Sequence, residues 1–147
     1  MSMFSSFDIN ASGLTAQRYR MDVISQNVAN ANTTRTSDGT PYRRKTVVFQ
    51  ERDSQTPFSR VLGNATERYA GNGVKVVGTY EDYSTDLVKT YDPAHPDADA
   101  DGYVLYPNVN IVTEMTNLID ASRSYEANAT AFEASKSIAL KGLEMAN

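Results

Sequence analysis

The sequence predicts a mainly α-helical fold in which a long helix at each end of the chain flanks a small β-rich insertion of a few strands. Near both ends, apolar residues recur at alternating steps of four and three, which is typical of helices that pack along one seam. Between the ends, short runs rich in β-branched residues alternate with turns that contain glycine and proline. These patterns divide the chain into residues 1–34, 35–106 and 107–147.

The C-terminal segment carries the clearest helical pattern. After Pro107 no further proline occurs, and Gly142 is its only glycine. Asn108 or Asn110 can cap the start of a helix over residues 108–145. Its predicted seam consists of Ile111, Met115, Leu118, Tyr125, Phe132 and Leu143, with polar steps at Ser122 and Lys136. This stripe fits either the core of a small helical bundle or a coiled-coil seam with another segment or another subunit.

A second amphipathic pattern covers residues 3–31. Its predicted seam consists of Phe4, Phe7, Leu14, Met21, Ile24 and Val28. Gly13 lies inside the pattern, and glycine destabilises a helix interior by about 1 kcal/mol relative to alanine. We therefore expect the first dozen residues to form a separate or frayed piece. Because the two terminal segments share one period, we expect them to pair with each other.

Three asparagines, Asn27, Asn30 and Asn32, gather where the first helix is expected to end. Asparagine tolerates the left-handed conformation that ends a helix, and its amide bonds readily to nearby backbone. Two interpretations follow. The asparagines form a polar turn at a helix terminus, or their amides dock onto a neighbouring backbone at a crowded junction.

The middle segment is expected to form strands over residues 45–50, 74–80 and 86–91, with a loop or irregular insertion over 51–73. Two or three strands alone are marginally stable in water. The β-rich part should therefore lean on the helices or on another subunit. Its aromatic residues fit half-buried strand positions or an interface; they are Tyr80, Tyr83, Tyr91, Tyr103 and Tyr106.

An acidic loop with two prolines covers residues 92–102. The first half of a calcium-binding EF-hand loop is matched by Asp97, Asp99, Asp101 and Gly102. However, Asn108 stands where that motif requires a bidentate glutamate, and Pro93 and Pro96 block the incoming helix. We therefore favour a rigid loop whose aspartates cap turns, and we do not favour a calcium site.

Composition and motifs argue against several classes of function. The chain has 147 residues, a net charge of −4 and no cysteine. These values disfavour a nucleic-acid partner held by phosphate contacts, and they exclude disulfides and thiolate metal sites. His95 is the only histidine and has no evident second ligand or base. We expect no enzyme activity and therefore no catalytic, cofactor-binding or metal-binding residues.

The sequence also lacks a membrane-spanning run and a secretory signal. No apolar run approaches the roughly 20 residues that a membrane span needs. The N-terminal residues show no basic start followed by an apolar block, so we expect no cleaved signal peptide.

Three stretches resemble the axial proteins of the bacterial flagellum, the rod and hook proteins, and in particular the proximal rod proteins. They are residues 13–33, residues 91–110 and residues 122–128. The signature residues in them are Asn27, Asn30, Asn32, Asp92, Pro93, His95, Pro96, Asp97, Asp99, Asp101 and Gly102. Over residues 35–85 only the general layout matches.

The resemblance implies a structural subunit with no catalytic role. Such proteins are exported unfolded through the flagellar type III apparatus, without a cleaved signal, and assemble in the periplasm. Their terminal helices pair as a coiled coil that lines the inner tube of the rod, the drive shaft that transmits torque from the motor to the hook and filament. The implied partners are further copies of the chain, other proximal rod proteins, the adaptor between rod and membrane ring, the distal rod protein and the export apparatus.

Other interpretations of the sequence remain open. One alternative is a different rod protein, proximal or distal. A second is a calcium-binding interaction module that uses the loop from Asp97 to Asp101. A third is an unrelated enzyme. For a rod subunit, a long apolar stripe is poorly covered on a single chain. We therefore expect the terminal segments to be largely disordered in the monomer and to fold on docking.

Overall fold

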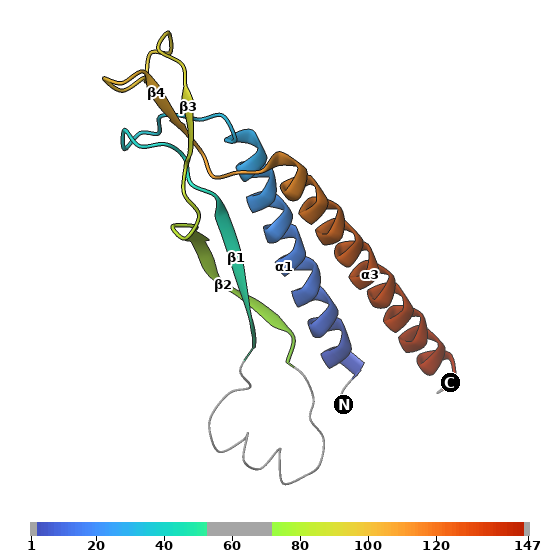
Figure 1. Cartoon of the computed structure of the whole chain (residues 1–147). Helices are drawn as coiled ribbons and strands as arrows, with labels where there is room; N and C mark the ends of the chain where they lie inside the picture. The colour runs from blue at the N-terminus through green and yellow to red at the C-terminus, as the bar shows by residue number, and fades with distance from the viewer. Residues whose placement is uncertain (1–2, 53–71, 146–147) are drawn as a thin grey trace, which may run out of the picture. The chain divides into compact units, whose positions relative to one another are not determined.

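The computed structural model describes residues 3–52 and 72–145, with side chains from residue 5 onward. The elements are α1 (Met3–Ala29), β1 (Lys45–Glu51), β2 (Val74–Glu81), β3 (Val88–Tyr91), β4 (Tyr103–Tyr106) and α3 (Ile111–Glu144) (Figure 1). The predicted mainly α-helical fold with a small β portion is thus confirmed. The Phe4 side chain of the predicted seam and most of the expected loop over 51–73 lie outside the described residues. No described helix has the length and hydrophobicity that crossing a membrane requires.

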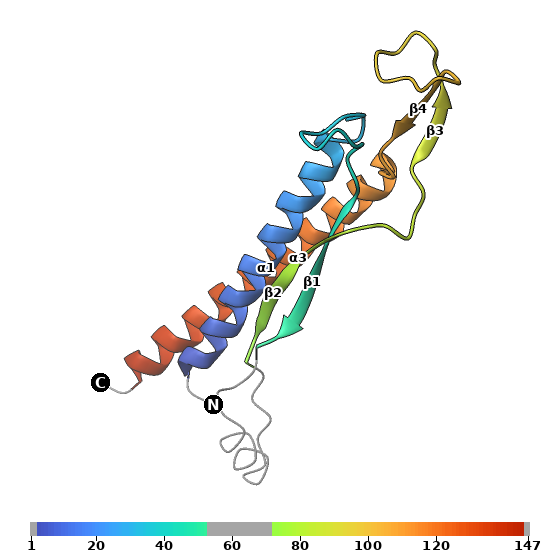
Figure 2. The same ribbon diagram turned by 90° about the vertical axis from the view of Figure 1, so that its left-hand side faces the viewer.

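Two compact units make up the chain, and each long helix contributes to both. Unit 1 comprises Met1–Tyr19, Phe49–Val77 and Ser122–Asn147. Unit 2 comprises Arg20–Val48 and Gly78–Ala121. Within each unit, a part of α1 lies beside a part of α3, and the two helices run in opposite directions (Figures 1 and 2).

In its described part, unit 1 has side-chain contacts between α1 and α3 and between α1 and β2. The rings of Phe7 and Phe132 meet edge to face, with centroids 5.2 Å apart. The Ser12 hydroxyl accepts a hydrogen bond from the Val74 N–H at 3.0 Å, which ties α1 to β2. Among the described residues of unit 1, only Ser12 and Ala16 are buried. The helix ends therefore bury little apolar surface within the single chain.

Unit 2 contains the core of the chain. Its buried apolar residues come from α1, the segment after it, β4, the link to α3 and α3; they are Val23, Ile24, Ala31, Tyr42, Val104, Pro107 and Ala121. Its buried polar residues are Asn27, Asn108 and Glu114. The high share of polar groups in this core requires that each be hydrogen-bonded, because an unpaired buried polar group is costly.

The strands form two separate two-stranded sheets, β1 with β2 and β3 with β4. The second is antiparallel, with Val88 opposite Tyr106 and Tyr91 opposite Tyr103. Strand β4 was not predicted from the sequence, because residues 103–106 were expected to form only a connection to the last helix. This strand has only four residues, and its central Val104 is fully buried, so its pairing depends on contacts distant in sequence.

The expected break near Gly13 is wrong, because α1 is continuous from Met3 to Ala29. The glycine has a packing role. A Cβ atom at position 13 would lie 2.9 Å from the Asn128 Oδ1 and 3.1 Å from its Cγ. The Asn128 amide is itself held, because its Nδ2 donates to the Ser124 carbonyl at 2.9 Å. Gly13 thus lets the Asn128 side chain of α3 pack directly against the backbone of α1.

We expect Gly13→Ala to destabilise unit 1 by about 1 kcal/mol, because overpacking outweighs the better helix propensity of alanine. The free energy at which α1 opens locally around residue 13, measured by amide hydrogen exchange, reports the effect. The control is the same substitution in an Asn128→Ala background, where the clash is gone and Gly13→Ala should stabilise by up to about 1 kcal/mol. Stabilisation by Gly13→Ala alone would contradict the packing role.

Candidate functional site

The side chain of Asn27 lies at the centre of unit 2 and is fully buried. Its Oδ1 accepts hydrogen bonds from the Lys45 N–H and the Tyr42 hydroxyl, each at 2.9 Å. Its Nδ2 donates to the Lys45 carbonyl at 2.8 Å and to the Glu114 Oε2 at 2.9 Å. The amide therefore uses both donors and both acceptor positions, and it joins the end of α1, the start of β1 and the start of α3.

Glu114 brings a charge into this core, with only 1% of its surface exposed. The guanidinium of Arg44 neutralises it, with Nε 2.9 Å and Nη2 2.8 Å from the Glu114 Oε1. The second carboxylate oxygen accepts from Asn27. A buried charge is tolerated only when it is paired and hydrogen-bonded in this way. We call Asn27, Tyr42, Arg44, Lys45 and Glu114 the Asn27 cluster.

Tyr42 supplies the remaining hydrogen bond of the cluster. It is 6% exposed. Burial, followed by the negative charges of Glu81 and Glu114, raises the pKa of Tyr42 to about 12. The phenol therefore stays protonated at neutral pH and keeps donating to the Asn27 Oδ1.

Asn108 ties a second set of backbone groups together. Its Oδ1 accepts from the Arg44 N–H at 2.9 Å, and its Nδ2 donates to the carbonyls of Asp82 and Thr85 at 3.0 and 3.1 Å. Of the two candidate caps for the last helix, Asn110 performs the capping, because its Oδ1 accepts from the Thr113 N–H at 3.2 Å. Asn108 instead fixes the chain that leads into α3.

The turn that Asn108 holds has further hydrogen bonds of its own. The Asp82 carboxylate accepts hydrogen bonds from the hydroxyls of Ser84 and Thr85 at 2.6 and 2.9 Å, and from their backbone N–H groups. These bonds lower the pKa of Asp82 to about 2.

The three signature asparagines, one in the last turn of α1 and two just after it, have different surroundings. Asn27 docks onto the Lys45 backbone, as the second interpretation of this run expects. The Asn30 Nδ2 donates to the Gln26 carbonyl at 2.9 Å, and its Oδ1 accepts from the Thr33 hydroxyl at 3.2 Å, as expected of a polar turn at a helix end. Asn32 is exposed. Only the first of the three reaches a distant part of the sequence.

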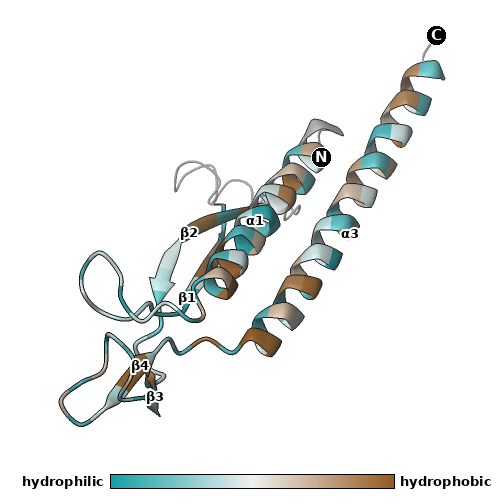
Figure 3. Cartoon of the chain, turned by 90° about the horizontal axis from the view of Figure 1, so that it is seen from above, coloured by the Kyte–Doolittle hydropathy of each residue, from teal (hydrophilic) through white to brown (hydrophobic). Residues whose placement is uncertain are grey.

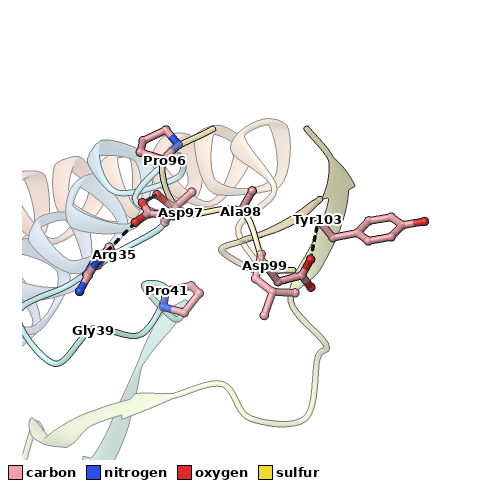
Figure 4. Close-up of a pocket in the computed structure, with 10 residues that line it drawn as sticks. Arg35, Gly39, Pro41, Pro96, Asp97, Ala98, Asp99 and Tyr103 are labelled. Atoms are coloured by element: carbon pink, nitrogen blue, oxygen red, sulfur yellow. Dashed lines mark hydrogen bonds and ion pairs between the residues drawn. The ribbon is translucent and has the colours of Figure 1, made fainter. Parts of the chain in front are cut away.

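The acidic loop is held by its own aspartates (Figure 4). Asp97 forms an ion pair with Arg35 at 3.6 Å and accepts from the Thr34 hydroxyl at 2.8 Å. The Asp99 carboxylate accepts from the N–H groups of Asp101 and Tyr103 at 3.0 and 2.8 Å. These carboxylates thus cap turns, and within the described part of the chain no three acidic or histidine side chains converge to hold a metal ion.

The remaining signature residues shape the same loop. Asp92 accepts from the Ala94 N–H at 3.2 Å, and the His95 Nδ1 accepts from the Asp97 N–H at 3.1 Å. Gly102 has a φ of 80°, a left-handed conformation that favours glycine. Pro93 and Pro96 are exposed. Pro96 also lines a hollow of about 450 Å³ between the loop and the chain after α1, together with Arg35, Pro41 and Asp97 (Figure 4).

The structure divides the predicted seam into covered and uncovered positions. Phe7 and Phe132 contact each other, and Ile24 is buried. Half-buried positions are Leu14, Met21, Val28, Leu118 and Tyr125. Uncovered positions are Ile111, Met115 and Leu143, which are 43%, 56% and 63% exposed.

Sequence reasoning missed several residues that hold the two helices together. They are Gly13, Arg44, Glu114 and Asn128. One signal was present, because Glu114 stands one residue before a predicted seam position and is the only acidic residue in the first turn of α3.

We expect Asn27→Asp to destabilise unit 2 by about 3 kcal/mol or more, because it replaces a donor to Glu114 with a second buried carboxylate. Urea unfolding measures the loss. Asn32→Asp, the same change at an exposed position, should have an effect within about 0.5 kcal/mol. Adding Glu114→Gln to Asn27→Asp should recover part of the loss. Equal effects at positions 27 and 32 would rule out the cluster as the organising contact.

The raised pKa of Tyr42 predicts a loss of stability at alkaline pH. Below the ordinary pKa of 10.0, the phenol is protonated in the folded and unfolded chains. As the pH rises from about 10 to about 12, the unfolded phenol ionises first, so the free energy of unfolding should fall. Thermal unfolding across this range measures the fall, and Tyr42→Phe should reduce its slope. An unchanged slope in this variant would refute the assignment.

Two family profiles match the ends of the chain. The family described as "Flagella basal body rod protein" matches residues 7–35, which include Asn27. The family described as "Flagellar basal body rod FlgEFG protein C-terminal" matches residues 100–145, which include Asn108 and Glu114. Both segments thus supply residues to the hydrogen-bond network of unit 2.

Curated relatives match over almost the whole length. The flagellar basal-body rod protein FlgC of Bacillus subtilis is 47% identical over 151 residues, covering 99% of each chain. The FlgC protein of Borreliella burgdorferi is 47% identical over 146 residues, covering 94% of this chain and 93% of the relative. The FlgC protein of an Escherichia coli strain is 43% identical over 145 residues, covering 99% and 98%. These matches confirm the resemblance seen in the sequence, and the chain belongs to the FlgC family of flagellar basal-body rod proteins.

Proposed function

We propose that the chain is a structural subunit of the proximal rod of the bacterial flagellar basal body and polymerises through its terminal helices into the drive shaft that transmits torque to the hook and filament. The observation that carries this proposal is the similarity to FlgC proteins over nearly the full length of both chains. The function is structural, and no catalytic residue is part of it.

The construction of the two units supports a role in which assembly completes the fold. Unit 2 has a core with a paired charge and a fully bonded Asn27 amide. Unit 1, in its described part, buries only Ser12 and Ala16. An apolar stripe that a single chain leaves uncovered is stabilised when another subunit covers it, at about 1.5–3 kcal/mol for each large side chain.

The three segments of the chain have distinct roles in this proposal. Residues 1–34 and 107–147 form the coiled-coil, tube-lining part, and residues 35–106 form the β-rich part outside it. Ile111, Met115 and Leu143 are the seam positions that contact neighbours, because their side chains are exposed in the single chain. Phe7 and Phe132 close the seam within the subunit.

The partners follow from the same assignment. They are further copies of the chain, the other proximal rod proteins, the adaptor between rod and membrane ring, and the distal rod protein. The chain reaches the periplasmic rod through the flagellar type III export apparatus, without a cleaved signal. The alternative of a calcium-binding module gains no support, because Asp97 and Asp99 already bind donors of the chain itself.

Complementation of a motile bacterium that lacks its own FlgC protein tests the proposal. The wild-type chain should restore swimming. Phe132→Asp should abolish it, because the charge is placed in the contact between the two helices. Leu118→Asp should act in the same way at a half-buried seam position.

Two controls accompany this test. Asp101→Ala changes an exposed side chain of the acidic loop and should leave swimming intact. Immunoblots of isolated basal bodies should show the wild-type chain and the Asp101→Ala variant, and not the seam variants. Full swimming with Phe132→Asp would show that the seam assignment is wrong, and no rescue by the wild-type chain would count against the rod function itself.

A further inference from the structure

A hollow of about 670 Å³ in unit 2 adjoins the one beside the acidic loop, and the two share Pro41 and Leu105. Its volume is in the range of protein pockets that enclose a ligand. We call this cavity the Tyr83 hollow. Its lining combines apolar, cationic and aromatic side chains, among them Pro41, Leu87, Leu105, Arg43, Lys45 and Tyr83.

The two cationic side chains of the Tyr83 hollow form no ion pair within the described part of the chain. The central carbon of the Arg43 guanidinium lies 4.5 Å from the centre of the Tyr83 ring, and its Nη1 donates to the Asp82 carbonyl at 3.3 Å. The Lys45 ammonium lies 5.5 Å from the centre of the Tyr42 ring. Both cations are therefore placed by aromatic rings and a carbonyl, without a neutralising carboxylate.

Two acidic residues line the same hollow, but their contacts are elsewhere. The Glu81 Oε2 accepts from the Tyr83 hydroxyl at 2.7 Å, and Asp38 is an exposed residue of the turn after α1. An apolar occupant alone would bury Arg43 and Lys45 without counter-charges, which is costly. An occupant that brings a carboxylate beside a small apolar group is therefore favoured.

The acidic loop, residues 92–102, carries this complementary chemistry. It contains four aspartates and neither lysine nor arginine. Asp97 and Asp99 bind groups of their own chain. Asp101 is exposed beside the exposed Ala100, and within the described residues no group donates a hydrogen bond to its carboxylate. Figure 3 shows that the loop extends beyond β3 and β4 and is largely hydrophilic, whereas β4 is hydrophobic.

We propose that the acidic loop of one copy of this chain docks into the Tyr83 hollow of a second copy, where Asp101 pairs with Arg43 and Lys45. The proposal rests on the proposed rod function, in which copies assemble with one another. The loop of the same chain is held at the adjoining hollow, because Asp97 binds Thr34 and Arg35 there, so the occupant comes from another chain.

This contact joins the β-rich parts of two subunits and uses none of the seam positions of the terminal helices. Loop and hollow are different surfaces that every copy carries, so the contact is heterologous and repeats from copy to copy. Opposite charges across such a contact select the partner and its register more than they add affinity.

Cross-linking with a water-soluble carbodiimide tests the contact, because this reagent joins a carboxylate to a lysine amine only where the two groups touch. The amide between Asp101 and Lys45 forms with loss of water, which the carbodiimide takes up to leave as a urea. The sample is basal bodies from a bacterium that lacks its own FlgC protein and carries the wild-type chain. Peptide mass spectrometry should find Asp101 joined to Lys45 in species of at least twice the mass of the chain.

Two variants separate the docking contact from general reactivity. Lys45→Arg keeps the charge but offers no reactive amine, so swimming should continue while the link is lost. Lys89→Arg is the matched control, because Lys89 lies 4.0 Å from the Asp99 carboxylate of its own chain. This variant should retain the link between Asp101 and Lys45.

Three outcomes would overturn the docking contact. They are the link in species with the mass of a single chain, links from Lys45 only to other proteins, and swimming cells whose basal bodies lack the link. The last outcome would leave the rod function standing. Failure of the wild-type chain to restore swimming would overturn the rod function, and the docking contact with it.

Discussion

Burial of the Asn27 amide is the interaction on which the rest of unit 2 depends. An asparagine side chain in a core is tolerated only when its two donors and its acceptor oxygen are all bonded. Here those bonds reach the Lys45 backbone, the Tyr42 hydroxyl and the Glu114 carboxylate. These groups come from three separate parts of the chain. The observed arrangement of the helix end, the first strand and the start of α3 therefore satisfies every hydrogen-bonding group of the amide.

The charge of Glu114 adds a second requirement to the same arrangement. Arg44 must reach one carboxylate oxygen while Asn27 reaches the other. A buried ion pair contributes little net stability, but removing one partner is strongly destabilising, so it selects one packing over alternatives. Because polar bonds specify how α1 meets α3 in unit 2, apolar residues such as Val112 and Ile119 remain exposed for other contacts. We infer that this division of roles lets unit 2 fold within one subunit while exposed apolar residues of α3 stay available for contacts with other subunits.

The elements that the sequence predicted are those with local signals. The period of apolar residues predicted both helices, and β-branched runs predicted strands at residues 45–50 and 74–80, close to the observed Lys45–Glu51 and Val74–Glu81. The packing role of Gly13 was not predictable, because it depends on Asn128, which lies 115 residues away in the sequence. The same holds for β4, whose pairing with β3 needs the intervening loop to be folded.

The candidate site was predictable in part. Asn27 was singled out because several asparagines in a short run are unusual, and amide docking was one of two interpretations. Its partner Glu114 was missed, since an acidic residue beside an apolar stripe normally faces solvent. The seam residues were assigned to one surface because a repeat cannot distinguish contacts inside the chain from contacts between chains. Phe132 and Leu143 both lie on the predicted seam, yet only Phe132 is half-buried against α1.

The central claim is that the Asn27 cluster orders unit 2 in the single subunit, whereas the helix ends in unit 1, which bury few side chains, open easily in the single subunit and gain most of their stability on assembly. Amide hydrogen exchange on the purified monomer tests it most directly, because exchange reports local opening along each helix. The account predicts slow exchange for residues 20–29 and 111–121 and faster exchange, through local opening, for residues 5–19 and 122–144. Uniform protection along both helices, or fast exchange around Asn27 and Glu114, would contradict it.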